Sequence, residues 1–175
     1  NTAKANFFDA ENNDTYQTAN AHNIDVAGAG TIGYEKDPVN HTIDYQDWYI
    51  FTLPADSKIQ IVETTSSELY SGIYLYDSNG TNQIASKAAK KGGSDTLTYV
   101  NLAAGTYYLC LINWNYSYGS YTFNISYAPA LLSNDAEPNS TFTEANTLAI
   151  NTETTGHIGY YSNYVTDYDD WYKFT

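Results

Sequence analysis

The stretch Asp44-Tyr-Gln-Asp-Trp-Tyr-Ile-Phe-Thr52 reads as an acidic loop that runs directly into a β-strand. Asp44 and Asp47 stand three residues apart, just before an aromatic run at 48–51 whose side chains favour strands. Hard cations bind clustered carboxylate and carbonyl oxygens on loops whose backbone can bend. The stretch therefore predicts a strand and part of a cation site.

The same stretch returns near the end of the sequence as Asp167-Tyr-Asp-Asp-Trp-Tyr-Lys-Phe-Thr175. Upstream, Asp9-Ala-Glu-Asn-Asn13 matches Asp135-Ala-Glu-Pro-Asn139, and Ile32-Gly-Tyr34 matches Ile158-Gly-Tyr160. The second copy lacks three residues between its glycine and its aspartates. An internal repeat of this length corresponds to a whole domain and is too long for a solenoid unit.

The repeat divides the sequence into one complete domain and the beginning of another. We expect the complete domain at residues 7–128, a linker at 129–133, and the first third of a second domain at 134–175. The last strand of the partial copy lacks its own sandwich partners and would expose an edge. The partial copy is therefore a candidate surface for self-association by strand addition or swapping.

The motifs resemble, in type and order, those of the bacterial pre-peptidase C-terminal domain. After the acidic opening, the glycine and the Asp-x-x-Asp-Trp-Tyr-x-Phe stretch come Leu75-Tyr-Asp-Ser-Asn-Gly80 and Ala104-Gly-Thr-Tyr-Tyr-Leu109, which resemble its middle and closing motifs. The resemblance covers residues 7–128 and again 133–175. It implies a module that flanks secreted peptidases or other hydrolases, and some members of the family bind collagen.

The resemblance also implies a calcium site. In the related collagen-binding domains of clostridial collagenases, calcium lies between an acidic N-terminal segment and the Asp-x-x-Asp loop. By motif position the ligands here would be Glu11, Asn13, Asp14, Asp44 and Asp47, with Asp9 as a further candidate. The matching residues of the second copy are Glu137, Asn139, Asp167 and Asp170. Ser140 replaces Asp14 there, which predicts a weaker site.

Simple electrostatics favours the same cation, since carboxylates brought together repel unless a cation neutralises them. The alternative is a set of helix caps and solvated loop carboxylates, with Asp14 as an N-cap.

Seven or eight short strands separated by turns predict an all-β fold, an antiparallel, jelly-roll-like β-sandwich. One short N-terminal helix is expected at Thr15–Ala21. Asp77-Ser-Asn-Gly80 is a strong hairpin signal. The lysine-rich stretch Lys87–Gly93 reads as a solvated loop, and Cys110 as a small core residue that forms no disulfide or zinc site.

The composition excludes several classes of partner. The formal charge is −13, from 20 acidic and 7 basic residues. Nucleic acid and anionic membrane surfaces need a basic face, so neither is an expected partner. No stretch approaches the roughly 20 apolar residues of a membrane span. The sequence begins at Asn1 without a signal peptide, as expected for a mature or excised piece of a secreted, extracellular or cell-surface protein.

Aromatic residues point to a binding surface. The sequence holds 19 tyrosines, and Trp114, Tyr116, Tyr118 and Tyr121 crowd one loop and the start of the next strand. Rigid rings interleaved with amides suit recognition of a neutral polymer. The alternative is that these rings merely cover one end of the sandwich.

No catalytic signature accompanies the aromatic residues. The three histidines have no ligand-spaced partner, and there is no nucleophile elbow, metalloprotease motif or phosphate loop. We therefore expect a non-catalytic, calcium-stabilised module that anchors an attached hydrolase to an insoluble polymer. Polysaccharide is slightly preferred over collagen-like protein, and self-assembly through residues 134–175 is the other alternative.

Overall fold

The computed structural model describes residues 9–37, 39–162 and 164–174. The predicted domain start at residue 7 therefore lies outside the described residues. The elements are the 3-10 turn η1 (Tyr16–Thr18) and the strands β1 (Asn20–Ala21), β2 (Ala27–Ile32), β3 (Glu35–Asp37), β4 (Thr42–Ile43), β5 (Gln46–Leu53), β6 (Ser57–Tyr76), β7 (Gln83–Leu102), β8 (Gly105–Asn113), β9 (Gly119–Pro129), β10 (Asn146–Thr147), β11 (Tyr161–Ser162), β12 (Val165–Thr166) and β13 (Tyr172–Lys173).

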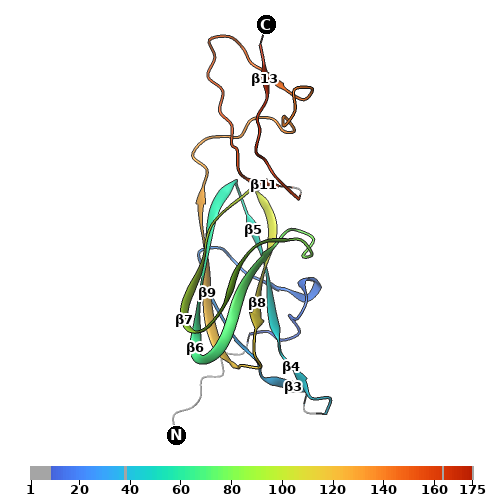
Figure 1. The fold of residues 1–175 in the computed structure, drawn as a ribbon, viewed down its shortest axis with the longest axis vertical. Coiled ribbons are helices and arrows are strands. Elements are labelled where there is room, and N and C mark those ends of the chain that lie inside the picture. Colours follow the sequence, from blue (N-terminus) through green and yellow to red (C-terminus); the bar gives the residue numbers. More distant parts are fainter. Residues whose placement is uncertain (1–8, 38, 163, 175) are drawn as a thin grey trace.

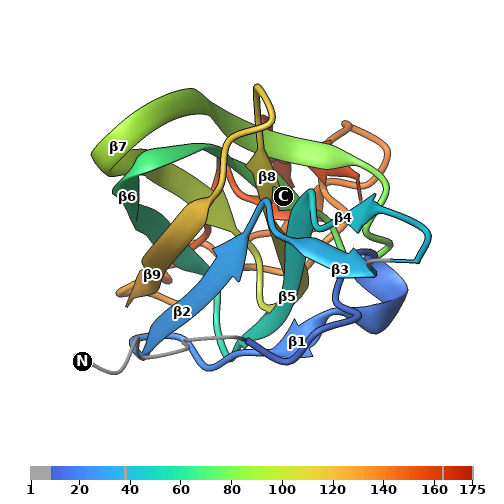
Figure 2. The same ribbon diagram turned by 90° about the horizontal axis from the view of Figure 1, so that it is seen from below.

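Two 20-residue strands, β6 and β7, organise the fold. They pair antiparallel along their length (Figure 1). Residues 57–65 of β6 pair with β9, which continues to β2, whereas residues 71–76 pair with β8, which continues to β5 and β1. The sheet therefore curls from β2 and β9 round to β8 and β5, as the end-on view shows (Figure 2).

The all-β class predicted from the sequence is confirmed, but nine strands form one continuous curled sheet where a sandwich of two separate sheets was expected, and β3 with β4 and β10 with β13 form two-stranded sheets of their own. The reason is that β6 and β7 bend from one wall of the curl to the other without breaking. The pairing of β6 with β7 shifts register between Thr65 and Tyr70, which locates the bend. The predicted hairpin at Asp77–Gly80 is present, and the backbone N–H of Gly80 donates to the carbonyl of Asp77 at 2.9 Å.

Two local predictions were wrong. The expected helix at Thr15–Ala21 is only the three-residue turn η1. Strand β1 begins directly after it and pairs with β5, so the backbone is drawn into the sheet instead. The expected loop at Lys87–Gly93 is the middle of β7, where Lys90 pairs with Ser71 across the ladder. Polar side chains did not prevent a strand there because the backbone alone makes the ladder.

The core fills the inside of the curl. Alternate residues of β6 point inward, as their burial pattern shows, and the same holds for β5, β8 and β9. Cys110 is buried on β8, as predicted. The largest fully buried side chains are Tyr121, Phe51, Ile32, Leu53, Ile59, Ile61, Leu69, Ile73, Leu75, Leu102, Leu109 and Leu111.

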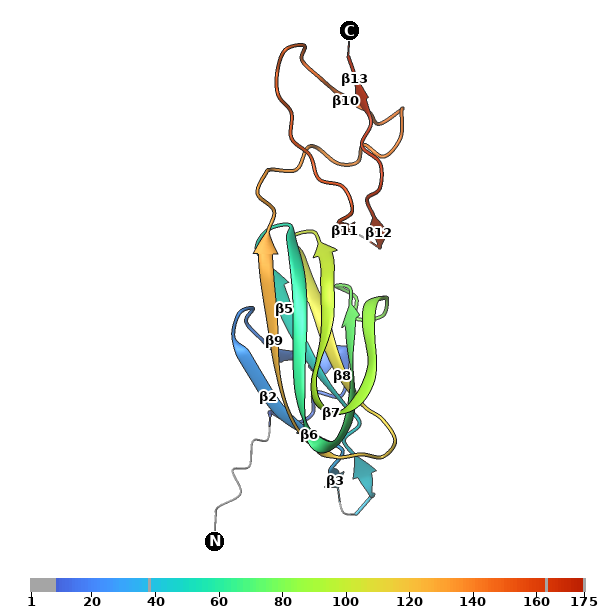
Figure 3. The same ribbon diagram turned by 60° about the vertical axis from the view of Figure 1, so that its left-hand side comes forward.

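Residues 130–174 extend beyond one end of the curled sheet (Figures 1 and 3). They touch it where Tyr161 of β11 pairs with Leu102 of β7, and where His157 Nδ1 lies 3.2 Å from Asp56 Oδ2. Their own strands are two-residue pairs, β10 with β13 and β11 with β12. Within the described part of the chain, no helix is long and apolar enough to cross a membrane.

Candidate cation sites and an exposed aromatic surface

The predicted calcium ligands of the first copy do come together, and we call Asp9, Glu11, Asn13, Asp14, Asp44 and Asp47 the first acidic cluster. Backbone contacts fix the two halves of this cluster. The Trp48 N–H donates to the carbonyl of Asn13 at 2.8 Å, which holds the N-terminal segment against the start of β5. The Gly33 N–H donates to the carbonyl of Asp44 at 2.8 Å. The loop before β5 and the acidic opening therefore face one another.

The inner part of the first acidic cluster holds buried oxygens without partners. Asn13, Asp44 and Asp47 are all buried. Asn13 Oδ1, Asp44 Oδ2 and Asp47 Oδ1 have no hydrogen-bond partner among the described residues. Each such atom destabilises the fold by about 1–3 kcal/mol unless something else binds it. An oxygen-only donor set of carboxylates and an amide is the kind that calcium takes.

The pKa values in the cluster reflect its crowded negative charge. Burial, opposed by Lys36 and reinforced by Glu11 and Asp14, raises the pKa of Asp44 to about 7. Burial, with the nearby charges of Asp44 and Asp9, raises the pKa of Asp47 to about 9. The ionised carboxylates therefore lack sufficient compensation from the protein alone, and a cation would supply it.

A lysine that contacts the first acidic cluster was not predicted from the sequence. Lys36, on β3, places its Nζ 3.0 Å from Asp44 Oδ1 and 3.2 Å from Glu11 Oε2, and it also contacts Asp14. Burial alone would lower the pKa of Lys36, but the contacts with these carboxylates outweigh it and raise the pKa. The hairpin of β3 with β4 returns the chain to Asp44 beside Lys36, and the loop-like sequence of this stretch gave no sign of that hairpin.

The matched residues of the C-terminal segment also come together, as a second acidic cluster of Asp135, Glu137, Asn139, Asp167 and Asp170. Carboxylate oxygens of Asp135, Glu137 and Asp170 lie within 4.8 Å of one another. Asp135 Oδ1, Asn139 Oδ1, both Asp167 oxygens and Asp170 Oδ1 have no hydrogen-bond partner among the described residues.

In the second cluster, too, burial and crowded negative charge raise carboxylate pKa values. Burial, followed by the charges of Asp167 and Asp135, raises the pKa of Glu137. Burial, followed by the charges of Asp135 and Asp167, raises the pKa of Asp170.

The two clusters are held by corresponding hydrogen bonds. In the first cluster, Asn13 Nδ2 and the Tyr49 hydroxyl donate to Asp9, and in the second, Asn139 Nδ2 and the Tyr172 hydroxyl donate to Asp135. The backbone N–H of Trp48 donates to the Asn13 carbonyl, as that of Trp171 does to the Asn139 carbonyl. The backbone N–H of Gly33 donates to the Asp44 carbonyl, as that of Gly159 does to the Asp167 carbonyl. The parallel pairing of β1 with β5 corresponds to that of β10 with β13.

The predicted ligand-binding residues divide into two groups. Trp114, Tyr116 and Tyr118 are exposed, and with exposed Tyr34 and Tyr45 they form what we call the aromatic surface. Tyr34 and Tyr118 contact edge to face at 5.7 Å between ring centroids, and Tyr45 and Tyr116 do so at 6.4 Å. This surface borders β3 and β4, at the end of the sheet opposite residues 130–174 (Figure 1).

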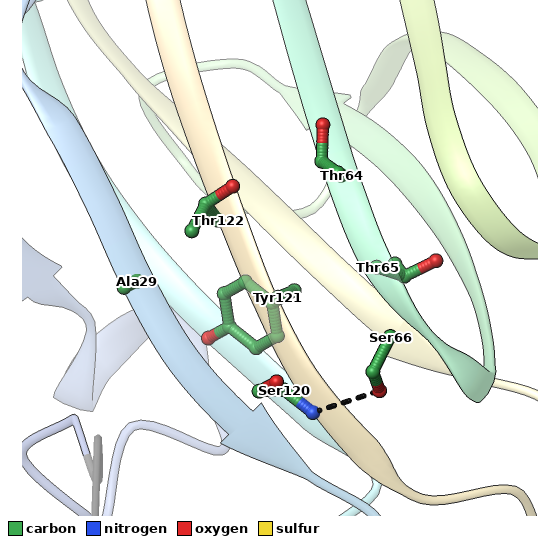
Figure 4. Close-up of a pocket in the computed structure, with 7 residues that line it drawn as sticks. All are labelled: Ala29, Thr64, Thr65, Ser66, Ser120, Tyr121 and Thr122. Atoms are coloured by element: carbon green, nitrogen blue, oxygen red, sulfur yellow. Dashed lines mark hydrogen bonds between the residues drawn. The ribbon is translucent and has the colours of Figure 1, made fainter. Parts of the chain in front are cut away.

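Tyr121, the fourth predicted ligand-binding residue, does not belong to the aromatic surface. It is 2% exposed, its hydroxyl donates to Asp47 Oδ2, and its phenol oxygen lies 2.6 Å from that of Tyr49. Its ring also backs a pocket of about 330 Å³ between β2, β9 and β6 (Figure 4). The other lining residues are Ala29, Thr64, Thr65, Ser66, Ser120 and Thr122. Side chains alternate between the two faces of a strand, so Ser120 and Tyr121 of β9 point to opposite faces, and the Tyr121 ring lies on the core side.

Comparison with known sequences gives one family. The bacterial pre-peptidase C-terminal domain matches residues 45–112, from the end of the first Asp-x-x-Asp loop to the end of β8, which is less than half of the chain. No curated protein matches the sequence.

Solved structures give further matches at low identity. The pre-peptidase C-terminal domain of a collagenase from Bacillus anthracis is 20% identical, with a TM-score of 0.47 over 62% of this chain and 94% of that one. PliG, a periplasmic inhibitor of g-type lysozyme, matches in its Salmonella Typhimurium form at 19% identity, with a TM-score of 0.38 over 63% and 100% of the two chains. The Aeromonas hydrophila form is 11% identical, with a TM-score of 0.38 over 63% and 97%.

Proposed function

We propose that the chain is a non-catalytic accessory module of a secreted protein, stabilised by calcium, which holds an attached hydrolase on an insoluble polymer. The aromatic surface carries this proposal. The family match at residues 45–112 supports the accessory role and an extracellular location. Residues 134–175 are, in this proposal, the beginning of a second copy of the domain, a reading that the corresponding hydrogen bonds of the two clusters support.

Hydrogen bonds tie down the loop at residues 114–118, which presents three rings of the aromatic surface. Ser117 Oγ lies 2.6 Å from Asn113 Oδ1, Asn113 Nδ2 donates to the Ser117 carbonyl at 2.8 Å, and the Trp114 N–H donates to the Tyr70 carbonyl at 2.8 Å. Tyr116 has φ +52° and is 88% exposed. A bulky residue held in left-handed backbone conformation with its ring in water is unfavourable for folding alone, and such strain concentrates at binding sites.

The chemistry of the aromatic surface favours a polysaccharide. Ring faces stack on sugar rings, while the neighbouring Asn115 supplies an amide. No lysine belongs to the surface, so attraction to an acidic polymer has no source there. A collagen-like protein is the alternative polymer, since extended peptides also pack on tyrosine rings.

Retention on solid polymers tests the binding role. Wild type and Tyr116→Ala are sedimented with insoluble polysaccharides and with collagen fibrils, and the unbound fraction is measured. We expect wild type to be retained on a polysaccharide and Tyr116→Ala to be released at least tenfold more readily, since aromatic anchors dominate such interfaces. Tyr168→Ala removes another exposed tyrosine ring, from the C-terminal segment, and is the matched control. Equal retention of all three proteins would remove the aromatic surface as the binding face.

Calcium stabilisation has its own test. A ligand that binds only the native state raises stability with its concentration. Thermal unfolding of the whole chain with calcium should show a higher midpoint than with a chelator. An identical midpoint in both conditions would leave the clusters as acidic loops without an ion.

Self-assembly through residues 134–175 is the second candidate, and one observation favours it. Phe174 is 74% exposed, whereas the matched Phe51 is 2% exposed inside the curl. Trp171 is also exposed, whereas the matched Trp48 is buried, so this segment presents rings whose counterparts are buried in the complete domain. Sedimentation velocity over a concentration series tests it, and a monomer at all concentrations would exclude it.

A further inference from the structure

The two acidic clusters differ in one charged residue. In the first, the ammonium of Lys36 contacts Glu11, Asp14 and Asp44, and its side chain is 19% exposed. The repeat matches Gly159 to Gly33, so the residue matched to Lys36 is Ser162, three residues after the glycine in each copy. Among the ion pairs between described residues, none includes a carboxylate of the second cluster.

The second cluster is also the more compact donor set. Within the described residues, the only three carboxylates whose oxygens all lie within 4.8 Å of one another are Asp135, Glu137 and Asp170. Asn139 is fully buried beside them, and its Oδ1 has no partner among the described residues. Asp135 Oδ2 accepts from Asn146 and Tyr172, which fixes the carboxylate and leaves Oδ1 for another ligand. These features independently indicate a cation-binding arrangement.

We propose that Lys36 is a built-in counter-cation that makes the first cluster a poor divalent site, so that the tighter calcium binding belongs to the second cluster. This rests on the calcium binding proposed above, and it reverses the ranking expected from Ser140. Calcium at the first cluster would have to displace the ammonium from three carboxylates and return it to water. At the second cluster, no such competitor has to leave.

Lys36 supplies only part of the charge and contacts that a calcium ion would supply to the first cluster. An ammonium carries one charge and three donors, and it makes contacts on the outer side of the cluster with Glu11, Asp14 and Asp44. Asn13 Oδ1 and Asp47 Oδ1 on the inner side remain without partners. The first cluster therefore keeps the ligands of a calcium site, but Lys36 competes with calcium for them. Removal of the lysine should restore calcium binding.

Calcium titration of the whole chain by calorimetry tests this directly. The variants are Lys36→Ser, which copies the second cluster, Asp44→Asn in the first cluster, and Asp167→Asn in the second. Lys87→Ser makes the same change of charge beside Asp95, on β7, and is the matched control. Circular dichroism with a chelator reports whether each variant is folded before titration.

We expect wild type to bind one tight equivalent of calcium that Asp167→Asn abolishes and Asp44→Asn leaves unchanged. Lys36→Ser should gain a second equivalent, at least about tenfold tighter than any first-cluster binding in wild type, and adding Asp44→Asn to it should remove that gain. Lys87→Ser should behave as wild type. A Lys36→Ser protein that folds only with calcium would also support the proposal, because the ion would then replace the ammonium.

Other outcomes separate this inference from the proposed function. Tight binding in wild type that Asp44→Asn abolishes, or no gain in Lys36→Ser, would overturn the role of Lys36 while calcium stabilisation stands. A gain in Lys36→Ser without any binding in wild type would support the counter-cation and overturn native calcium binding. No binding by any folded variant would overturn both.

Discussion

At the scale of single residues, the least expected feature is the buried pair of phenols that supports the first acidic cluster. Tyr121 donates to Asp47, and the hydroxyl of Tyr49 lies 2.6 Å from that of Tyr121 and 3.1 Å from Asp9 Oδ2. Burial raises the pKa of both phenols, so they stay protonated and act as donors. The phenols thereby orient the carboxylates from inside the core.

Removing one phenol hydroxyl tests that support. Tyr121→Phe would leave Asp47 Oδ2 buried without a donor, which should lower the free energy of unfolding by about 1–3 kcal/mol. Urea denaturation in the presence of chelator measures the change without interference from metal ions. Tyr118→Phe, at an exposed ring, should stay within about 0.5 kcal/mol of wild type. Equal stability of the two variants would show that the hydroxyl of Tyr121 does not support Asp47.

Glu63 gives a second prediction at this scale, and it concerns pH. Burial on β6, with the charge of Asp95, raises the pKa of Glu63 from 4.5 to about 7. Because the folded-state pKa of Glu63 lies above its unfolded value, the stability that depends on protonated Glu63 is fully present below pH 4.5. This contribution is lost as the pH rises through about 7. Glu63→Gln cannot ionise, so wild type should weaken relative to it from pH 5 to pH 8.

The size of that pH effect is bounded by the shift, at about 3 kcal/mol for the fully ionised group. Unfolding free energies of wild type and Glu63→Gln, measured in urea at several pH values, give the difference directly. Glu68→Gln makes the same chemical change at an exposed position of the same strand and is the matched control. A difference between wild type and Glu63→Gln that stays constant with pH would mean that Glu63 is ionised in the folded protein throughout.

At the scale of elements, the turn from β2 into β3 sets where Lys36 and Asp44 meet. Gly33 sits in this turn with φ +87°, and a Cβ there would lie 2.1 Å from the carbonyl oxygen of Ser117. The turn is therefore pressed against the loop that carries the aromatic surface. The glycine is needed both for its backbone conformation and for this close approach.

Gly33→Ala should consequently be more harmful than the same change at a left-handed glycine with open space around it. Gly93 has φ +81°, but a Cβ there meets nothing within 4 Å, so Gly93→Ala isolates the backbone strain at about 1 kcal/mol. Gly33→Ala adds the clash and should cost at least about 2 kcal/mol. Thermal unfolding of the two variants compares them. Similar losses would mean that the Ser117 loop yields easily.

Sequence reasoning succeeded with elements whose signal is local and missed those set by distant contacts. The hairpin at Asp77–Gly80 and the strand after Asp47 follow from turn residues and alternation. The bend in β6 does not, because it depends on which partner strand lies beside each half. Lys36 was missed because a single lysine in a loop-like stretch gives no sign of the carboxylates that the hairpin brings to it.

The same distinction holds for the candidate site. Motif position picked out acidic residues that the structure brings together, since the hydrogen bonds that fix them are made by the motifs themselves. Tyr121 was placed on the surface because it follows the aromatic loop closely in the sequence, whereas its inward direction depends on the register of β9 with β2. Register is a property of the folded sheet that no short window of sequence carries.

At the scale of the whole molecule, the two parts of the chain are stabilised differently. The curled sheet has a continuous core from β2 to β9. Among the described residues from 130 to 174, only Asn139 and Ala145 are buried. Apolar burial therefore contributes little to residues 130–174, and the order of this segment depends on its hydrogen bonds and on the second acidic cluster.

This difference leads to a prediction for hydrogen exchange. Without a cation the carboxylates of the second cluster repel, so calcium should slow exchange in residues 135–174 far more than in the core strands. The Gly159 and Trp171 amides are the sharpest reporters, because they donate to the carbonyls of Asp167 and Asn139. Mass spectrometry with calcium and with chelator measures both regions in one sample. In Asp167→Asn the difference between the two conditions should shrink for residues 135–174. Equal protection of the core strands and of residues 135–174 by calcium would instead mean that the ion stabilises the molecule as a single cooperative unit.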